Sequence, residues 1–153
     1  MFGLENHYLK QLSSYCLERF DDVIPSDYIT EEKLRNNRKY IINLDTSNEP
    51  GSHFVAISVR GNTIIYFDSF GQRCSNQHIS NAINASKKTL LRVSCIQIQS
   101  IKSLFCGYFC LAFLIFDHYG ISFDEFLKKF NENDLDSNDS ICINIIKSHI
   151  LMK

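Results

Sequence analysis

Residues 103–113 read SLFCGYFCLAF and open the most apolar run of the chain. From Phe109 to Phe116 the run is apolar on nearly every face of a helix, which predicts a buried helix from about Cys106 to Tyr119. Glycine costs roughly 1 kcal/mol relative to alanine inside a helix, so Gly107 is expected where another backbone or a ligand comes close. Cys106 would then lie at the helix N-terminus, where free N–H groups and the helix dipole favour a thiolate. The position suits a reactive cysteine without proving one.

Other segments of the chain show helical or strand periodicity around this run. In chain order, the predicted elements are an amphipathic helix over Leu4–Cys16, a short helix capped by Thr30, a strand at Tyr40–Leu44, a hairpin of His53–Val59 and Thr63–Asp68, a polar helix at Ser75–Leu90, a strand at Val93–Ile98, the apolar helix, and two helical pieces separated by Asn131–Asp139. The predicted fold class is α+β. A small mixed central sheet packs against the buried helix that carries Cys106 at its N-terminus. Repeats and long linkers are absent from the sequence, so residues 1–153 are expected to form one domain.

Composition and charge exclude several classes of protein. The chain is 44% hydrophobic and 22% charged, and a net charge of −1 argues against an obligatory electrostatic grip on nucleic acid. No run reaches the roughly 18 apolar residues of a membrane span, and no secretory signal is visible. The six cysteines follow neither a disulfide framework nor a zinc pattern. We therefore expect a protein without a membrane span, metal or cofactor, in an intracellular, reducing compartment.

The predicted hairpin brings a histidine and an aspartate together. With a two-residue loop, Arg60 pairs with Thr63 and His53 lies opposite Phe70. Asp68 is then a diagonal neighbour of His53 on the same face, with Cβ atoms about 7 Å apart. Taken singly, each residue has a plainer interpretation, the histidine as a strand-start residue and the aspartate as a turn cap. A cysteine in an apolar run is likewise more often inert packing.

Together, these residues resemble the adenovirus-type maturation proteases (adenain), relatives of the SUMO- and ubiquitin-like-protein proteases. The resemblance runs from about Phe20 to Phe116. The matching pieces are Gly51-Ser52-His53-Phe54-Val55-Ala56, Tyr66-Phe67-Asp68-Ser69-Phe70-Gly71, and Gln99 followed seven residues later by Cys106-Gly107-Tyr108-Phe109-Cys110. The implied fold is the adenain-like, permuted papain-like cysteine protease fold.

The resemblance implies a role for each of four residues. Cys106 matches the nucleophile, His53 the general base that forms a thiolate–imidazolium pair with it, and Asp68 the acid that orients the imidazole. Gln99 matches the side-chain donor of the oxyanion hole, whose second donor would be the backbone N–H of Cys106. One such donor typically contributes about 3 kcal/mol to transition-state stabilisation. Gln97 is a rival for the glutamine role, but it falls within the alternating pattern and two residues too early.

The same resemblance implies that Gly51, Phe54 and Gly107 bind substrate. Phe54 stands where the family usually has tryptophan, so an aromatic wall is kept. A side chain at Gly107 would crowd the substrate backbone or the strand that carries His53. The acid Asp68 is typical of the SUMO-type enzymes, whereas Phe105 replaces the aspartate that commonly precedes their cysteine. The motif Cys106-Gly107-Tyr108-Phe109-Cys110 and the seven-residue spacing from Gln99 to Cys106 favour the adenain branch.

Three functions fit this pattern. The first is an endopeptidase that processes viral or mobile-element precursors, such as capsid or core proteins, at glycine-containing sites. The second is an isopeptidase that removes a ubiquitin- or SUMO-like modifier after Gly-Gly. The third is a catalytically silent domain that binds a partner. The short chain leaves little room for a broad modifier-binding face, which favours the first.

The family resemblance also implies activators. Adenain-type enzymes are stimulated by DNA and by a short peptide that can be disulfide-linked to the enzyme. Cys95 is the candidate for such a disulfide, and an ordinary half-buried strand residue is the alternative. Cys110 is expected to pack in the core one turn below Cys106. If the protein is viral, the expected location is the host nucleus or the virion.

Overall fold

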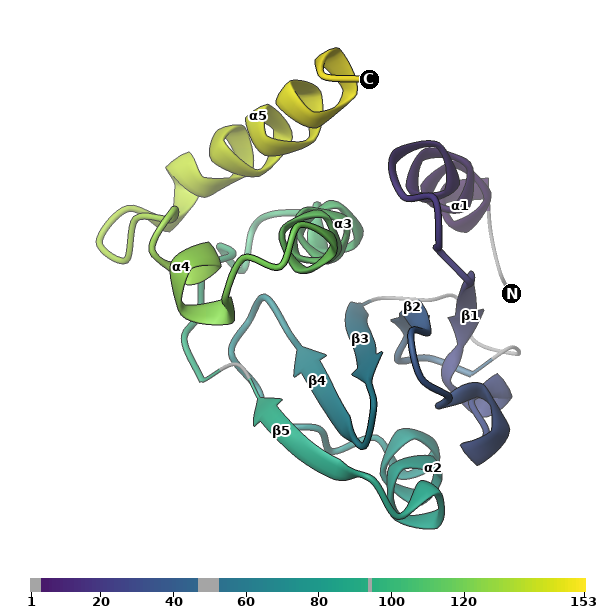
Figure 1. Cartoon of the computed structure of the whole chain (residues 1–153). Helices are drawn as coiled ribbons and strands as arrows, with labels where there is room; N and C mark the ends of the chain where they lie inside the picture. The colour runs from purple at the N-terminus through teal and green to yellow at the C-terminus, as the bar shows by residue number, and fades with distance from the viewer. Residues whose placement is uncertain (1–3, 47–52, 94) are drawn as a thin grey trace.

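A five-stranded mixed sheet forms the centre of the computed structural model, which describes residues 4–46, 53–93 and 95–153 (Figure 1). The spatial order follows the chain: β1 (Asp22–Pro25), β2 (Lys39–Asn43), β3 (Phe54–Arg60), β4 (Thr63–Phe67) and β5 (Thr89–Val93). The two outer pairs, β1–β2 and β4–β5, are parallel, and the two inner pairs are antiparallel. The mixed sheet with its helices confirms the predicted α+β class.

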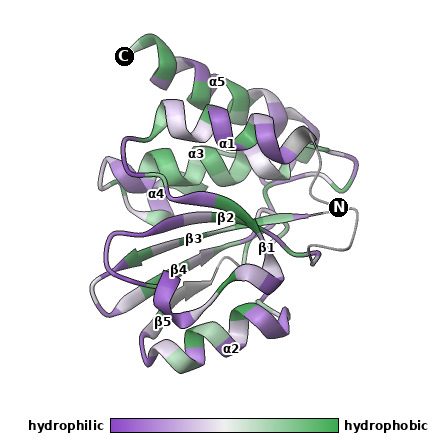
Figure 2. Cartoon of the chain, turned by 90° about the vertical axis from the view of Figure 1, so that its right-hand side faces the viewer, coloured by the Kyte–Doolittle hydropathy of each residue, from purple (hydrophilic) through white to green (hydrophobic). Residues whose placement is uncertain are grey.

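Helices cover both faces of the sheet (Figures 1 and 2). The helices are α1 (Leu4–Cys16), α2 (Gln77–Ser86), α3 (Cys106–His118), α4 (Phe123–Leu127) and α5 (Asn138–Leu151), with 3-10 turns at Ser26–Tyr28, Glu31–Lys33 and Leu135–Ser137. The α2 helix covers one face, where it contacts the 3-10 turns at Ser26–Tyr28 and Glu31–Lys33. On the other face α3 packs on the sheet, and α1 and α5 pack against α3.

This layering explains why α3 is apolar all round. Its side chains meet the sheet below and other helices above, so ten of its residues are buried and most of the helix is hydrophobic (Figure 2). The ring of Phe113 stacks on Phe67 of β4 with centroids 5.0 Å apart, and Phe126 of α4 closes the same cluster. The helix predicted from about Cys106 to Tyr119 is confirmed as α3.

The hairpin register is also confirmed. Arg60 pairs with Thr63 and the ladder runs back to Ala56 opposite Phe67. Gly61 in the loop has a φ of +56°, a left-handed conformation that glycine adopts without strain. Alternate side chains of β3 enter the two cores on opposite faces of the sheet, so the register decides which residues face α3.

Two predictions in the middle of the chain were wrong. The helix expected over Ser75–Leu90 is confined to α2, because the Asn76 side chain caps its start and Lys87 ends it in a left-handed conformation, with φ of 59°. The last strand is Thr89–Val93, not Val93–Ile98, because the edge of β4 pairs with the earlier segment. Strand β1 was not predicted, since its four residues carry no clear alternation.

A buried ionic cluster fastens the C-terminal end of α3 to the sheet. Asp117 of α3 is 5% exposed and accepts hydrogen bonds from Lys39 of β2, from Ser58 of β3 at 2.6 Å and from Arg60 Nε at 3.1 Å. Lys39 is itself buried. Since a buried charge without its partner is strongly unfavourable, the cluster fixes where α3 can lie.

Asp117→Ala is expected to destabilise the protein by about 3 kcal/mol, because it leaves Lys39 buried and unpaired. Urea denaturation of Asp117→Ala, Lys39→Met and the double variant measures this, with the exposed Asp136→Ala as the control. The double variant should lose less than the sum of the single losses. Strictly additive losses would contradict a coupled pair.

Candidate active site

The open end of the hairpin brings together His53, just before β3, and Asp68, just after β4. His53 Nε2 lies 2.8 Å from Asp68 Oδ1, and since an ionised carboxylate only accepts, Nε2 donates. Asp68 is 2% exposed, and its Oδ1 also accepts from the backbone N–H of Phe70 at 2.8 Å. The predicted contact is present, and Asp68 fills both the pairing and the turn-capping role.

The imidazole is held in one orientation. The ring of Phe70 stacks on it with centroids 4.7 Å apart, as their opposition in the predicted hairpin required. With Nε2 on Asp68, the other ring nitrogen, Nδ1, is buried and meets no hydrogen-bond partner of ordinary geometry in the described residues. The side chain of Cys106 interacts with the imidazole. Nδ1 is the nitrogen left to face the thiol.

The surroundings of His53 keep its imidazole charged. Burial by itself lowers the pKa of His53, but the hydrogen bond to Asp68, the interaction with Cys106 and the negative charge beside the ring outweigh it and raise the pKa to about 9. At neutral pH the ring is therefore an imidazolium with the Asp68 carboxylate on one side and the Cys106 sulfur on the other. This is the charge arrangement that activates a cysteine nucleophile.

Cys106 is the first residue of α3 and is 7% exposed. The first N–H groups of a helix have no partner within it, so the Cys106 amide is suited to bind an oxyanion. Gly107 lets other elements approach this helix end: a Cβ there would lie 2.6 Å from the Leu9 side chain of α1 and 3.5 Å from Phe54. The distance to Phe54 is an ordinary van der Waals contact, so the strand after His53 does not crowd this position. The close approach is that of the Leu9 side chain, which was not predicted.

Gln99 is fully buried in the loop that leads to Cys106. Its Oε1 accepts from the Ser69 hydroxyl, and its Nε2 donates to Ser103 O and Oγ, both at 3.1 Å. Because the Ser103 carbonyl can only accept, the amide orientation is fixed. Its assignment as an oxyanion donor stays a prediction. The rival, Gln97, is exposed and donates to the Gln99 carbonyl at 2.9 Å.

The remaining predicted site residues have mixed outcomes. Gly51 lies outside the described residues. Phe54 is a core residue, 5% exposed, so a direct contact with substrate stays a prediction. Cys95 is exposed and follows β5 rather than lying on a strand. Cys110 is fully buried below Cys106, as predicted, and burial raises its pKa well above the ordinary value, so it stays a thiol.

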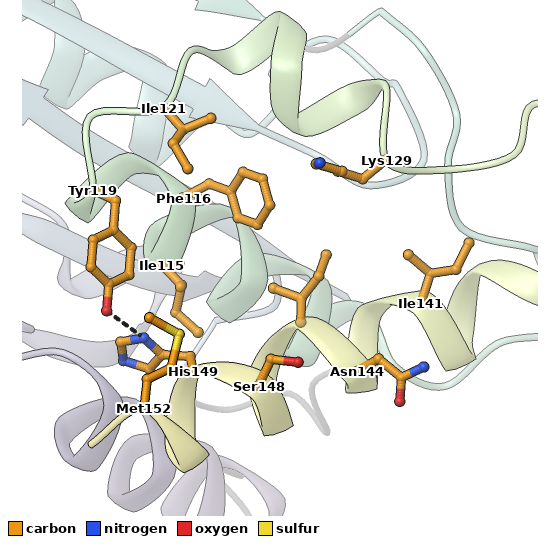
Figure 3. Close-up of a pocket in the computed structure, with 11 residues that line it drawn as sticks. Ile115, Phe116, Tyr119, Ile121, Lys129, Ile141, Asn144, Ser148, His149 and Met152 are labelled. Atoms are coloured by element: carbon orange, nitrogen blue, oxygen red, sulfur yellow. Dashed lines mark hydrogen bonds between the residues drawn. The ribbon is translucent and has the colours of Figure 1, made fainter.

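A large apolar groove lies elsewhere on the molecule. It has a volume of about 650 Å³ between the C-terminal half of α3 and α5, where Ile115, Phe116 and Ile141 line it (Figure 3). At its end Tyr119 bonds His149 at 2.9 Å. None of the predicted catalytic residues lines this groove, which is therefore separate from the candidate site.

Within residues 4–46, 53–93 and 95–153, no three His, Cys, Asp or Glu side chains gather as metal ligands would. None of the helices in the same ranges has the length and apolar character needed to span a bilayer.

Comparison with known proteins gives structural similarity only. No family model and no curated protein matches the sequence. Two solved structures of the pS273R protease of African swine fever virus (ASFV) are similar to the chain. One has 22% identity and a TM-score of 0.51, covering 74% of this chain and 42% of that one. The other has 16% identity and a TM-score of 0.60, covering 95% of this chain and 65% of that one.

The chain thus spans less than two thirds of the length of either protease structure. At these identities the similarity establishes a shared fold.

Asp68→Asn is expected to lower the pKa of His53 more than Cys106→Ala does, because the hydrogen bond to Asp68 raises that pKa more than the interaction with Cys106. An NMR titration measures both, with His53→Ala identifying the signal among five histidines. An equal or larger fall in Cys106→Ala would contradict this ranking.

The stability of the protein should depend on pH through the same histidine. Its pKa is about 9 when folded and 6.5 ordinarily, so the stabilisation is complete below pH 6.5 and is lost as the pH rises to 9. The loss is on the order of 3 kcal/mol. Urea denaturation across this range should show a steeper decline for wild type than for His53→Ala. Equal declines in the free energy of unfolding of the two proteins would contradict this pH dependence.

Proposed function

We propose that the chain is a cysteine endopeptidase in which Cys106 is the nucleophile, His53 the general acid and base, and Asp68 the group that orients His53. The observation that carries the proposal is the imidazole of His53, bonded to Asp68 through Nε2 and leaving Nδ1 for the thiol at the start of α3. The shared fold with a viral protease supports it.

In the first step, the thiolate of Cys106 attacks the carbonyl carbon of the scissile peptide bond. The carbonyl oxygen becomes an oxyanion, and the C–N bond breaks as imidazolium Nδ1 gives its proton to the leaving amine. A thioester on Cys106 and a neutral His53 remain. Asp68 keeps its bond to Nε2 throughout, so the ring cannot turn away.

In the second step, the neutral His53 takes a proton from water as the water oxygen attacks the thioester carbon. The C–S bond then breaks, the thiolate leaves, and the product departs as a carboxylic acid that gives its proton to solvent. The imidazolium beside Cys106 is restored, which returns the site to its starting charge state.

The oxyanion in both steps would be bound by the Cys106 backbone N–H and by Gln99. The two Nε2 hydrogens of Gln99 are on Ser103 before substrate binds, so one of them has to be shared with the oxyanion. The buried amide has little freedom to move, which is the preorganisation that such a donor needs.

The proposed substrates are viral or mobile-element precursor proteins cut at glycine-containing sites. Gly107, which lets the Leu9 side chain close in beside a nearly buried Cys106, supports a narrow approach that large side chains would not enter. We place the enzyme inside the cell, and in the nucleus or virion of an infected host if it is viral. Activation through DNA or a peptide joined to the exposed Cys95 remains part of the proposal.

The decisive assay compares wild type with Cys106→Ala on peptides that carry glycine at and near the cleavage site. Wild type should cleave them, whereas Cys106→Ala should lose cleavage by at least about 10³-fold. Cys95→Ser is the matched control, since it removes an exposed thiol and should keep activity in the absence of an activating peptide.

Other outcomes of this assay separate the alternatives. Labelling of Cys106 by a Gly-Gly vinyl-sulfone ubiquitin or SUMO probe, without peptide cleavage, would replace precursor processing by deconjugation. The chain would instead be a binding domain if it cleaves no peptide, if the probes do not label Cys106, and if Cys106 reacts with iodoacetamide no faster than Cys95 does.

Leu104 is expected to contact substrate. It is 82% exposed and lies two residues before Cys106, and Ile101 in the same loop is 83% exposed. Leu104→Ser should raise KM for a good peptide several-fold with little change in kcat, because it removes apolar contact shared by ground and transition states. Leu151→Ser, at a similarly exposed leucine at the end of α5, is the control. A fall in kcat at unchanged KM would argue against this role.

A further inference from the structure

The first turn of α5 reaches across to the loop that leads to Cys106. Asn138 is fully buried, and its Nδ2 donates to the carbonyl of Ile98 at 2.8 Å and to that of Asn131 at 2.9 Å. The next residue, Asp139, accepts the hydroxyl proton of Ser103 on Oδ1 at 2.7 Å. Two consecutive residues of α5 therefore hold the loop near both of its ends.

Ser103 connects Asp139 to the proposed oxyanion hole. Its Oγ accepts from Gln99 Nε2 and from the backbone N–H of Phe105, both at 3.1 Å. A serine hydroxyl has one proton to donate and two lone pairs to accept. Asp139 takes the proton, so both lone pairs are available for Gln99 and Phe105.

The carboxylate of Asp139 fixes the direction of the hydrogen bonds at the Ser103 hydroxyl. An ionised carboxylate only accepts, so the Ser103 hydroxyl cannot turn its proton toward Gln99 or Phe105. Without that acceptor the hydroxyl could rotate and release either donor.

We propose that Asp139 is a positioning residue for catalysis, acting through Ser103 on the Gln99 amide and on the backbone that enters Cys106. Asn138 holds the same loop through its hydrogen bond to the Ile98 carbonyl. The inference rests on the proposed peptidase function and adds to it a residue from the far helix α5. Asp139 sets the geometry of the oxyanion donors and leaves the Cys106–His53 pair unaffected.

Steady-state kinetics of Asp139→Ala tests the role. We expect kcat to fall about 10- to 100-fold with KM within about twofold of wild type, because misplaced oxyanion donors weaken transition-state binding. The rate of Cys106 alkylation by iodoacetamide should be unchanged, since that reaction needs no oxyanion hole. Asp139→Asn, whose amide oxygen still accepts, should lose less, and Asp136→Ala, an exposed neighbour, should behave as wild type.

A double-variant cycle tests the route through Ser103. Because the proposed route from Asp139 to Gln99 runs through that hydroxyl, Ser103→Ala/Asp139→Ala should be no slower than the slower single variant. Multiplied losses would overturn the route. Wild-type kcat in Asp139→Ala, or a kcat loss matched by an equal loss of alkylation rate, would overturn the positioning role.

Hydrogen exchange separates this inference from the proposed function. The Phe105 amide should exchange faster in Asp139→Ala than in wild type or Asp136→Ala, whether or not the protein cleaves peptides. Faster exchange in a protein without peptidase activity would reject the function and keep the link from Asp139 to the loop. Unchanged exchange in an active enzyme would reject the link and keep the function.

Discussion

The burial of α3 between the sheet and the helices α1 and α5 is the constraint on which the rest of the structure depends. A helix that is apolar on every face has no stable place at the surface, so it must be enclosed on all sides. Enclosure fixes both of its ends. At the far end Asp117 meets Lys39 and Ser58 in the sheet. At the near end Cys106 is held where the hairpin opens, beside His53.

The register of the hairpin decides whether His53 and Asp68 meet. Because side chains alternate along a strand, a slip of one residue would turn His53 away from Asp68 and from α3. The ladder from Arg60–Thr63 to Ala56–Phe67 prevents that slip. The same ladder lets Asp68 serve two partners, the imidazole of His53 and the backbone of Phe70, so its carboxylate is oriented by the turn before it orients the histidine.

Local patterns predicted the parts of the fold that depend on local forces. The apolar run after Gly107 and the loop at Gly61 were enough for α3 and the hairpin, and counting along the hairpin placed His53 against Asp68. Strand β5 and its true bounds depend on the free edge of β4, a long-range partner that no local alternation reveals. The approach of Leu9 to Gly107, and of Asp139 to Ser103, likewise joins residues far apart in the chain.

Ser69 couples two parts of the site in a way that bears on how the chain can change. Its carbonyl accepts the backbone N–H groups of Ile98 and Gln99 at 2.9 and 3.1 Å, and its hydroxyl binds the Gln99 amide. The segment from Phe70 to Gln97, which carries α2 and β5, is thus tied together at its two ends. The entropy cost of closing such a segment grows only slowly with its length. Residues can therefore be gained or lost far from Ser69 while the two tied ends keep their geometry. Length variation among related chains is therefore expected to accumulate in this segment, away from Ser69. The positions of Asp68, Gln99 and Cys106 relative to one another would then stay the same.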